Sequence, residues 1–323
     1  MNEHIFIILI ALAIDGIWGD NHFFWKKINH PIKYFGKFID WLDNEFNREE
    51  FSSNAKILNG AAVVVAMTFL AYLIGLFLEK LFLIFPFSII FEAIFVSVFI
   101  AARSLFDHVK AVNSSLIQEG LEEGRSKLSL IVGRDVSNLD FGGILRAAIE
   151  SLAENFSDGV VAPILWYLIF GIPGLLIYKL INTADSMIGH KNSKYVDFGM
   201  FTARFDDLLN YVPARFSSVL IIIASFILRE DFKSSIKITK EDHNKHSSPN
   251  SGWPESAMSG ALGVSLGGLR IYEQEEVDEG IMNVSGERDI DDNHLTRSLW
   301  IYTTANIVGV IILLLVFIPS IIF

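Results

Sequence analysis

Long apolar runs are the feature that most constrains what this chain can fold into. Residues 57–78, 81–102 and 299–323 each match the roughly 20 apolar residues that a helix needs to cross a bilayer. Hydrophobic residues make up 51% of the 323 residues, and the mean hydropathy is +0.42. We therefore expect an all-α, polytopic helical membrane protein rather than a soluble globule.

Charge and cysteine usage exclude several classes of function. The formal net charge is −11 and the sequence pI is about 5.2, so nucleic acid is not an expected partner. The chain has no Cys, which excludes disulfides, thiolate nucleophiles and Cys-based zinc or iron–sulfur sites.

Loop charges predict the orientation of the chain in the bilayer. No Lys or Arg precedes the first apolar run, whereas residues 20–56 carry six, so the positive-inside rule places 20–56 in the cytoplasm. A hairpin of the next two spans then returns the chain to the cytoplasm at Arg103. We expect a single integral-membrane domain, 1–323, with spans at about 5–18, 57–78, 81–102, 160–181, 212–228 and 299–323. Amphipathic cytoplasmic helices and polar, site-forming regions are expected at 103–158, 182–215 and 243–271.

The span at 160–181 is interrupted by Gly171, Pro173 and Gly174. Such breaks are tolerated at membrane depth where the backbone lines protein or a cavity. A re-entrant hairpin, the interpretation that we favour, would bring residues 182–187 back beside 150–155. A simple crossing would leave them on opposite sides of the membrane.

Two further elements are predicted near the C-terminus. A helix is expected to start near Pro254 and run to about residue 269, with Gly263 and Gly267 forming a GxxxG that permits close helix approach. The acidic segment 273–292 is expected to be a solvated loop.

Charged and amide residues are concentrated between residues 131 and 215, among apolar spans where ionisable groups are costly. Arg146, Glu150, Glu154 and Asp158 are spaced by four and would form one stripe on a helix. The three carboxylates repel unless a cation shares them, and oxygen ligands of this kind suit Mg²⁺. The alternative is a solvated face of a cytoplasmic helix, although neighbouring Asn155 favours a site.

A second group follows the broken span. Asn182 and Asp185 would share one helix face, as ligands or as helix-end polarity. Asp206 and Asp207 are adjacent, so at most one of them can face a given site, and Arg204 could simply pair with Asp207.

Other candidates are individually weak. The His243–His246 spacing is poor support for a metal site. Arginines at 103, 134, 146, 204 and 215 could bind carboxylates or phosphates, or could act as juxtamembrane anchors. The chain contains no Walker A, GxGxxG or GxSxG motif. These patterns leave an enzyme and a transporter equally open.

An ordered set of sequence words adds to this interpretation. They are ALAIDGIWGD (11–20), HPIKYFGKFI (30–39), ARSLFDHVKAV (102–112), LSLIVGRD (128–135), ESLAENFSDGVVAP (150–163), YKLINTADSMIGHKN (178–192), FGMFTARFDDLLNYVPAR (198–215) and HSSPNSGWPESAMSGALGVSLGG (246–268). In order and spacing the chain resembles the adenosylcobinamide-phosphate synthase family of cobalamin biosynthesis.

The resemblance implies a multi-pass cell-membrane ligase whose site faces the cytoplasm. It would join adenosylcobyric acid to (R)-1-amino-2-propanol or its O-phosphate through an amide bond, with ATP and Mg²⁺ expected. Other cobalamin-assembly enzymes are possible partners. The alternative is a corrinoid transporter or a membrane scaffold for pathway enzymes.

With that reaction in view, the candidate residues receive hypothetical roles. The base would be one of Asp206, Asp207 or His246. Metal ligands would be Glu150, Glu154, Asp158 and Asp185. Substrate and phosphate binding would fall to Arg103, Arg134, Arg146, Lys191, Arg204, Arg215, Asn155, Asn182, Asn250 and Glu255.

Overall fold

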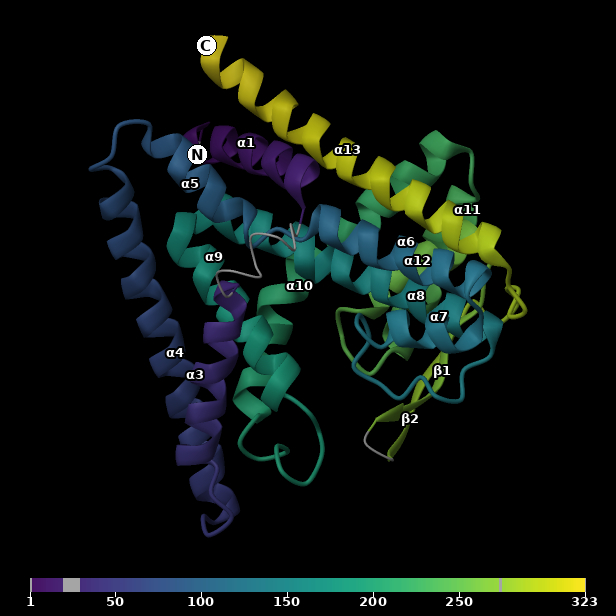
Figure 1. Ribbon diagram of the computed structural model, residues 1–323, viewed down its shortest axis with the longest axis horizontal. Helices are drawn as coiled ribbons and strands as arrows, with labels where there is room; N and C mark the ends of the chain where they lie inside the picture. The colour runs from purple at the N-terminus through teal and green to yellow at the C-terminus, as the bar shows by residue number, and fades with distance from the viewer. Residues whose placement is uncertain (1, 20–29, 273–274, 323) are drawn as a thin grey trace. The chain divides into compact units, whose positions relative to one another are not determined.

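The computed structural model describes residues 2–19, 30–272 and 275–322, so part of the polar stretch predicted at 20–56 lies outside the described residues. The described chain is helical almost throughout, with one antiparallel two-stranded sheet (Figure 1). The predicted all-α membrane fold is confirmed. The chain divides into two compact units, a first unit of residues 1–101 and 162–210 and a second unit of 102–161 and 211–323.

The first unit contains most of the long apolar helices. Gly75 allows two of them to approach closely, because a Cβ at this position would lie 2.5 Å from the Pro173 Cα atom. Gly60 has the same role against the Phe198 carbonyl. The elements are α1 (Asn2–Trp18), α3 (Pro31–Phe46), α4 (Ser53–Phe82), α5 (Ser88–Ser97), α9 (Ala162–Ile188) and the first part of α10 (Met200–Leu228).

The second unit is built around α8 (Phe141–Phe156), which is buried along most of its length. Asp140 caps this helix, its Oδ1 accepting the Gly143 N–H at 2.6 Å. The other elements are α6 (Ala102–Gln118), α7 (Leu121–Leu128), the π-helical turn η1 (Ser157–Val161), the end of α10, α11 (Phe232–Asp242), η2 (His243–Lys245), α12 (Gly252–Leu262), β1 (Leu266–Tyr272), β2 (Glu275–Met282) and α13 (Asp292–Ile322).

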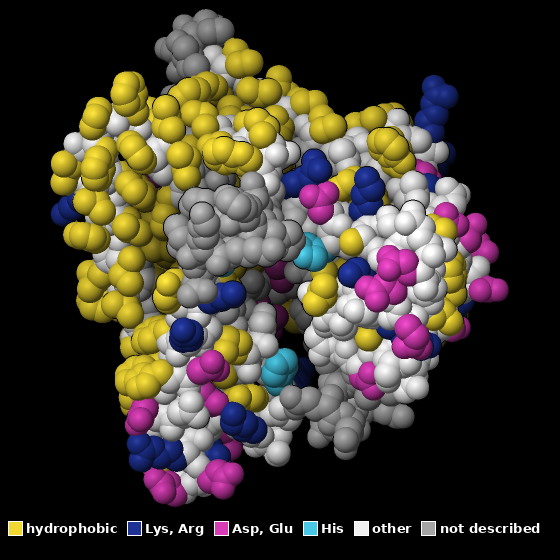
Figure 2. All heavy atoms as spheres, in the orientation of Figure 1, with side chains coloured by type: hydrophobic (Ala, Val, Ile, Leu, Met, Phe, Trp, Pro, Cys, Tyr) yellow, Lys and Arg dark blue, Asp and Glu magenta, His cyan; other side chains and the backbone are white. Residues whose placement is uncertain are grey.

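Five helical segments in the described chain are long and apolar enough to cross a membrane: 53–82, 88–118, 141–188, 200–228 and 292–318. Helix α4 shows the expected surface, because Val65, Phe69 and Phe77 are exposed along it. On the face seen in Figure 2, hydrophobic side chains cover wide areas, and charged side chains gather where α4 begins. Helix α1 covers the predicted span at 5–18 but has only 17 residues.

The predicted break in the fourth span is present. Gly171 has a φ of 64° and a ψ of −149°, a conformation open to glycine, and it interrupts α9. A Cβ on Gly174 would lie 2.4 Å from the Trp166 carbonyl oxygen. Residues eight apart in a straight helix are separated by about 12 Å, so the chain folds back sharply here. The fourth span therefore reverses direction locally, and the return of residues 182–187 beside 150–155 stays a prediction.

The prediction that the glycine-rich helix continues past Gly263 is wrong. Helix α12 ends at Leu262 because Gly263 adopts the left-handed conformation (φ 73°) that stops a helix. Gly267 and Gly268 also have positive φ and lie in β1, which pairs with β2 around an irregularity between Gly267 and Leu269. Gly263 and Gly267 therefore do not form a GxxxG helix face. The acidic segment is likewise not simply a solvated loop, since it includes β2.

Two predicted span boundaries also differ. The apolar run at 81–102 is divided, because α4 continues to Phe82 and the turn falls at 83–87, where Phe87 has a φ of 65°. The short span at 212–228 is part of α10, which has 29 residues and contains Pro213. The helix continues past the proline to Leu228, and the Ser217 hydroxyl donates to the Pro213 carbonyl at 2.8 Å.

Candidate functional site

The polar stripe of α8 is largely removed from solvent, which argues against its being a solvated face. Glu150 is 5% exposed and lies in the core of the second unit. Arg146 and Glu154 are half-buried. Asp158 is also half-buried but lies in η1, where the π-helical turn ends the regular four-residue spacing.

Glu150 joins three segments of the second unit. Its Oε2 accepts from Arg134 Nη2 at 2.7 Å, and its Oε1 accepts from the Gly267 N–H at 2.7 Å. Next to it, the Ser151 hydroxyl donates to the Ile131 carbonyl at 2.8 Å. The partner of Glu150 is therefore Arg134 from the IVGRD loop, not Arg146, with which spacing alone would have paired it.

Three arginines border a pocket beside this pair. Arg146 donates to the backbone carbonyl of Arg288, and both side chains line the same cavity of about 120 Å³. Asp135 is at its edge, where hydrogen bonds from the Ser137 backbone and side chain hold the pKa of Asp135 below its usual value. The full lining is Arg134, Asp135, Asn138, Leu139, Gly143, Arg146, Glu150, Gly267, Leu269 and Arg288.

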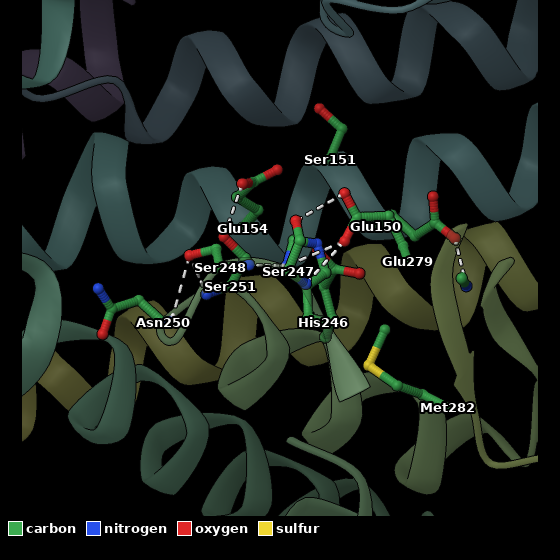
Figure 3. Close-up of polar contacts among 12 residues, drawn as sticks. Glu150, Ser151, Glu154, His246, Ser247, Ser248, Asn250, Ser251, Glu279 and Met282 are labelled. Carbon is green, nitrogen blue, oxygen red and sulfur yellow. Dashed lines mark hydrogen bonds and ion pairs between the residues drawn. The ribbon is translucent and has the colours of Figure 1, made fainter. Parts of the chain in front are cut away.

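The loop before α12 packs against α8. Ser251 donates to Glu154 Oε1 at 2.8 Å, so Glu154 is bound by a hydroxyl rather than by a second acid (Figure 3). Asn155 donates to the Ser151 carbonyl at 2.9 Å, a local contact within the helix. Asn250 is buried and accepts from Arg215 Nη1 at 3.2 Å.

Arg215 lies between two aromatic rings. Its guanidinium carbon is 3.5 Å from the Tyr211 ring centre and 4.6 Å from that of Trp253. The stacking holds the guanidinium plane and leaves its edge to donate hydrogen bonds.

His246 is enclosed by two buried glutamates. Its Nδ1 accepts the Ser248 N–H at 2.9 Å, so in this arrangement Nε2 carries the proton, 3.4 Å from Glu255 Oε1. Glu279 of β2 lies 3.5 Å from Nδ1 and accepts from the Ser247 N–H and hydroxyl (Figure 3). This cluster joins the sheet to the 246–255 loop. A role for His246 as a base stays a prediction.

The first unit contains a separate polar network, between α9 and α10. Asp206 is 7% exposed; its Oδ1 accepts from Asn182 at 3.3 Å and its Oδ2 from Asn210 at 2.9 Å. The Tyr178 hydroxyl donates to Asn210 Oδ1 at 3.0 Å. Asp206, not Asp207, is the buried member of the pair, and Asp207 is half-buried.

The remaining candidates lie at less enclosed positions. Asp185 is half-buried, and Lys191 and Arg204 are exposed in the first unit. In the second unit, Arg103 pairs with Asp107 one helical turn away at 2.8 Å, and both side chains are about half exposed. The roles predicted for these four residues stay predictions.

A metal site would need several carboxylate or imidazole groups close together. Among the described residues no group of three His, Asp or Glu side chains is placed to hold a metal ion. Glu150 is paired with Arg134 and Glu154 with Ser251. The described residues of the two units therefore form no protein-only metal cage. Mg²⁺ brought with substrate phosphates needs only one or two carboxylates, so the four metal ligands stay a prediction.

Sequence reasoning missed several residues of these sites. Arg288 and Glu279 lie in the segment assigned to a solvated loop, and Gly267 was assigned to a helix. The signal available for Arg288 was a basic residue within the run GERDIDD. Asn210, four residues after Asp206, could have been found by the same helix-face argument that relates Asn182 to Asp185.

The fold and these sites define a polytopic helical membrane protein with a small arginine-lined pocket and buried carboxylates, a set suited to binding oxyanions and moving protons. Comparison with known proteins then places it more narrowly. The family model described as CobD/Cbib protein matches residues 8–302, and the chain belongs to that family.

Curated relatives agree along nearly the whole chain. The cobalamin biosynthesis protein CobD of Rhizobium meliloti (strain 1021) is 46% identical over 287 residues, which cover 88% of both chains. That of Sinorhizobium fredii (strain NBRC 101917 / NGR234) is 48% identical over 290 residues, 88% of this chain and 89% of the relative. That of Brucella anthropi is 43% identical over 308 residues, 94% and 93%. A role in cobalamin biosynthesis is thereby supported. No solved structure matches the chain.

Proposed function

We propose that this protein is a ligase that forms the amide bond between adenosylcobyric acid and (R)-1-amino-2-propanol or its O-phosphate. The observation that carries the proposal is the pocket formed by Arg134, Arg146 and Arg288 around buried Glu150, in a chain whose family and relatives belong to cobalamin biosynthesis. Both substrates carry anionic groups that guanidinium side chains recognise.

The chemistry requires activation of the acid and deprotonation of the amine. A propionate carboxylate and an ammonium group do not condense at neutral pH, because the carboxylate has no leaving group and the ammonium has no lone pair. One carboxylate oxygen must leave as the C–N bond forms, and the nitrogen must lose protons to a base. ATP would supply the activation, and Mg²⁺ would accompany its phosphates.

Within this proposal the protein's own residues bind, orient and accept protons. The arginines hold carboxylates or phosphates in place. Asp206 is our preferred base, because its described hydrogen-bond partners are amides that orient the carboxylate without neutralising it. His246 is the weaker candidate, since it is enclosed by Glu255 and Glu279.

The direction in which the site faces is also part of the proposal. Lysines and arginines between residues 20 and 56, absent ahead of the first apolar run, support a cytoplasmic site. ATP and adenosylcobyric acid would then reach the protein from the cytoplasm. Other cobalamin-assembly enzymes would contact it from the same side.

The test is a reconstituted assay. Purified full-length protein in detergent is supplied with adenosylcobyric acid, aminopropanol O-phosphate and ATP, and the amide product is measured by mass spectrometry. Product that requires ATP and is lost on chelation of Mg²⁺ would support the proposal. Corrinoid transport across vesicles without product or ATP consumption would replace it with the carrier function.

The metal roles need their own variants. Glu150→Gln and Asp185→Asn are each compared with wild type for activity over a range of Mg²⁺ concentrations. A higher Mg²⁺ requirement in either variant supports that residue as a ligand. Full activity at unchanged Mg²⁺ in both would contradict the metal-site assignment.

A further inference from the structure

The arginine-lined pocket contains more positive charge than its acids balance. Arg134 is paired with Glu150 at 2.7 Å. Arg146 Nη2 lies 3.9 Å from Asp140 Oδ1, which already caps α8, and the more distant Glu150 and Asp289 carboxylates also act on it. No carboxylate among the described side chains forms an ion pair with Arg288. Beside the Arg134–Glu150 pair, the lining therefore has two arginines, Arg146 and Arg288, and one acid, Asp135, a net positive charge that a bound anion would balance.

The backbone holds these two arginines together. Arg146 Nη1 donates to the Arg288 carbonyl, which fixes the loop after β2 against α8. The Arg288 side chain makes only a long contact, 3.5 Å from its Nη2 to the Gly267 carbonyl. The donors of Arg288 are therefore mostly available to a ligand, while its backbone is fixed in position.

Glycines keep the space open on both sides. A Cβ on Gly268, where φ is +100°, would lie 3.0 Å from Arg288 Nη2. A Cβ on Gly142 would lie 3.0 Å from Arg146 Nη1. Side chains at these two positions would press on the guanidinium groups, so the glycines of β1 and of the start of α8 allow both arginines to approach the cavity.

The size of the cavity limits the ligand to a small group. At about 120 Å³ it is well below the roughly 300 Å³ at which pockets for whole drug-sized ligands begin. A corrin ring cannot enter. A carboxylate would be satisfied by one bidentate guanidinium, whereas a phosphate has three terminal oxygens and a charge of about −1.5 to −2 that matches two arginines.

We propose that Arg146 and Arg288 together bind the phosphate group of one substrate. The proposal rests on the ligase function above and adds to it the joint action of Arg146 and Arg288 on one group and a specificity for a phosphate monoester or polyphosphate. The source of that phosphate is either the phosphorylated amine or the nucleotide.

The experiment compares Arg288→Gln and Arg146→Gln with wild type in the full-length protein. The KM values for aminopropanol O-phosphate, unphosphorylated aminopropanol and ATP are measured separately. Loss of a charge-assisted contact should raise the KM of one phosphate-bearing substrate about 10- to 100-fold and leave that of unphosphorylated aminopropanol unchanged. A change for the phosphorylated amine alone identifies the amine as the source, and a change for ATP alone identifies the nucleotide.

A second readout does not depend on turnover. Titration calorimetry with inorganic phosphate should show binding to wild type and to Arg48→Gln, a control in which an exposed surface arginine is changed. Binding should be lost in Arg288→Gln and partly restored in Arg288→Lys, at unchanged melting temperatures. Equal phosphate binding and equal KM values in all variants would overturn the proposal. If wild type forms no amide but these binding differences hold, the ligase function fails and the phosphate site stands.

Discussion

The two units each bury a carboxylate, and they surround it in different ways. In the second unit Glu150 is held by the Arg134 guanidinium and the Gly267 N–H. In the first unit the described hydrogen-bond partners of Asp206 are two amides, Asn182 and Asn210. Both acids are nearly inaccessible to solvent.

The difference indicates what each acid can do. A carboxylate paired with arginine forms a neutral unit that fixes positions, because moving either partner leaves a charge buried. A carboxylate bound only by amides is oriented but keeps its charge or its proton for other use. Glu150 is thus suited to organising a site, and Asp206 to taking part in proton transfer.

The largest expected effect is on the paired acid. Glu150→Ala leaves Arg134 buried without its partner and should lower the free energy of unfolding by about 3–5 kcal/mol. Chemical denaturation in detergent, followed by circular dichroism, measures the loss. Glu150→Gln, which keeps an acceptor for the Gly267 N–H, should lose less. Wild-type stability in Glu150→Ala would show that the pair does not organise the second unit.

The amide-bound acid should behave in the opposite way. Asp206→Asn keeps one acceptor oxygen, and its NH2 replaces the other acceptor and faces an amide donor, so stability should fall by about 1 kcal/mol, while kcat for amide formation should fall about 10²- to 10⁴-fold. Steady-state kinetics measure this, with Glu45→Gln, a change at an exposed position, as the control. A stable Asp206→Asn protein with unchanged kcat would remove Asp206 as the base and leave Asp207 and His246.

A smaller loss of stability is expected in the loop before α12. Ser251→Ala removes the hydroxyl that donates to Glu154 Oε1 at 2.8 Å and should cost about 1 kcal/mol of stability. Thermal unfolding of this variant can be compared with Ser129→Ala, whose hydroxyl bonds only locally to the Ser126 carbonyl. Equal melting temperatures for Ser251→Ala and wild type would mean that this contact does not stabilise the loop on α8.

The smallest effect concerns an ion pair in the first unit between exposed Lys194 and buried Asp43. Lys194 donates to Asp43 at 2.8 Å and to the Tyr195 hydroxyl, and these bonds raise the pKa of Lys194 above 10.5. Because the folded-state pKa is the higher one, the stabilisation is complete below pH 10.5 and is lost as pH rises through the folded value. Solvent screening keeps it under about 1 kcal/mol.

Melting temperatures on either side of pH 10.5 test this pair. The decrease seen in wild type should be smaller in Lys194→Met. An identical pH dependence in the two proteins would show that Lys194 makes no titrating contribution to the first unit.

Part of the candidate site could be predicted from the sequence. The four-residue spacing correctly places Arg146, Glu150 and Glu154 along one helix, because helical periodicity is a local property. Gly171, Pro173 and Gly174 correctly predict the break in α9. Spacing could not give the partner of Glu150, since Arg134 and Gly267 come from segments 16 and 117 residues away.

The errors share one cause. The run around Gly263 and Gly267 has the composition of a helix interface, yet Gly263 ends α12 and Gly267 lies in β1. Glycine allows both conformations at little cost, so neighbouring contacts decide between them. The same holds for Glu279, which looks like a solvated acid and is buried beside His246 and Ser247.

A helical, membrane-embedded protein follows from the sequence alone, because apolar length and periodicity act within single segments. The charged residues that stand out against that background can also be identified from the sequence. It is the tertiary structure that pairs Glu150 with Arg134 and brings Arg288 to the same cavity as Arg146. It also decided that Asp206 rather than Asp207 is buried. Those outcomes depend on contacts between distant segments, where burial and charge are settled jointly rather than residue by residue.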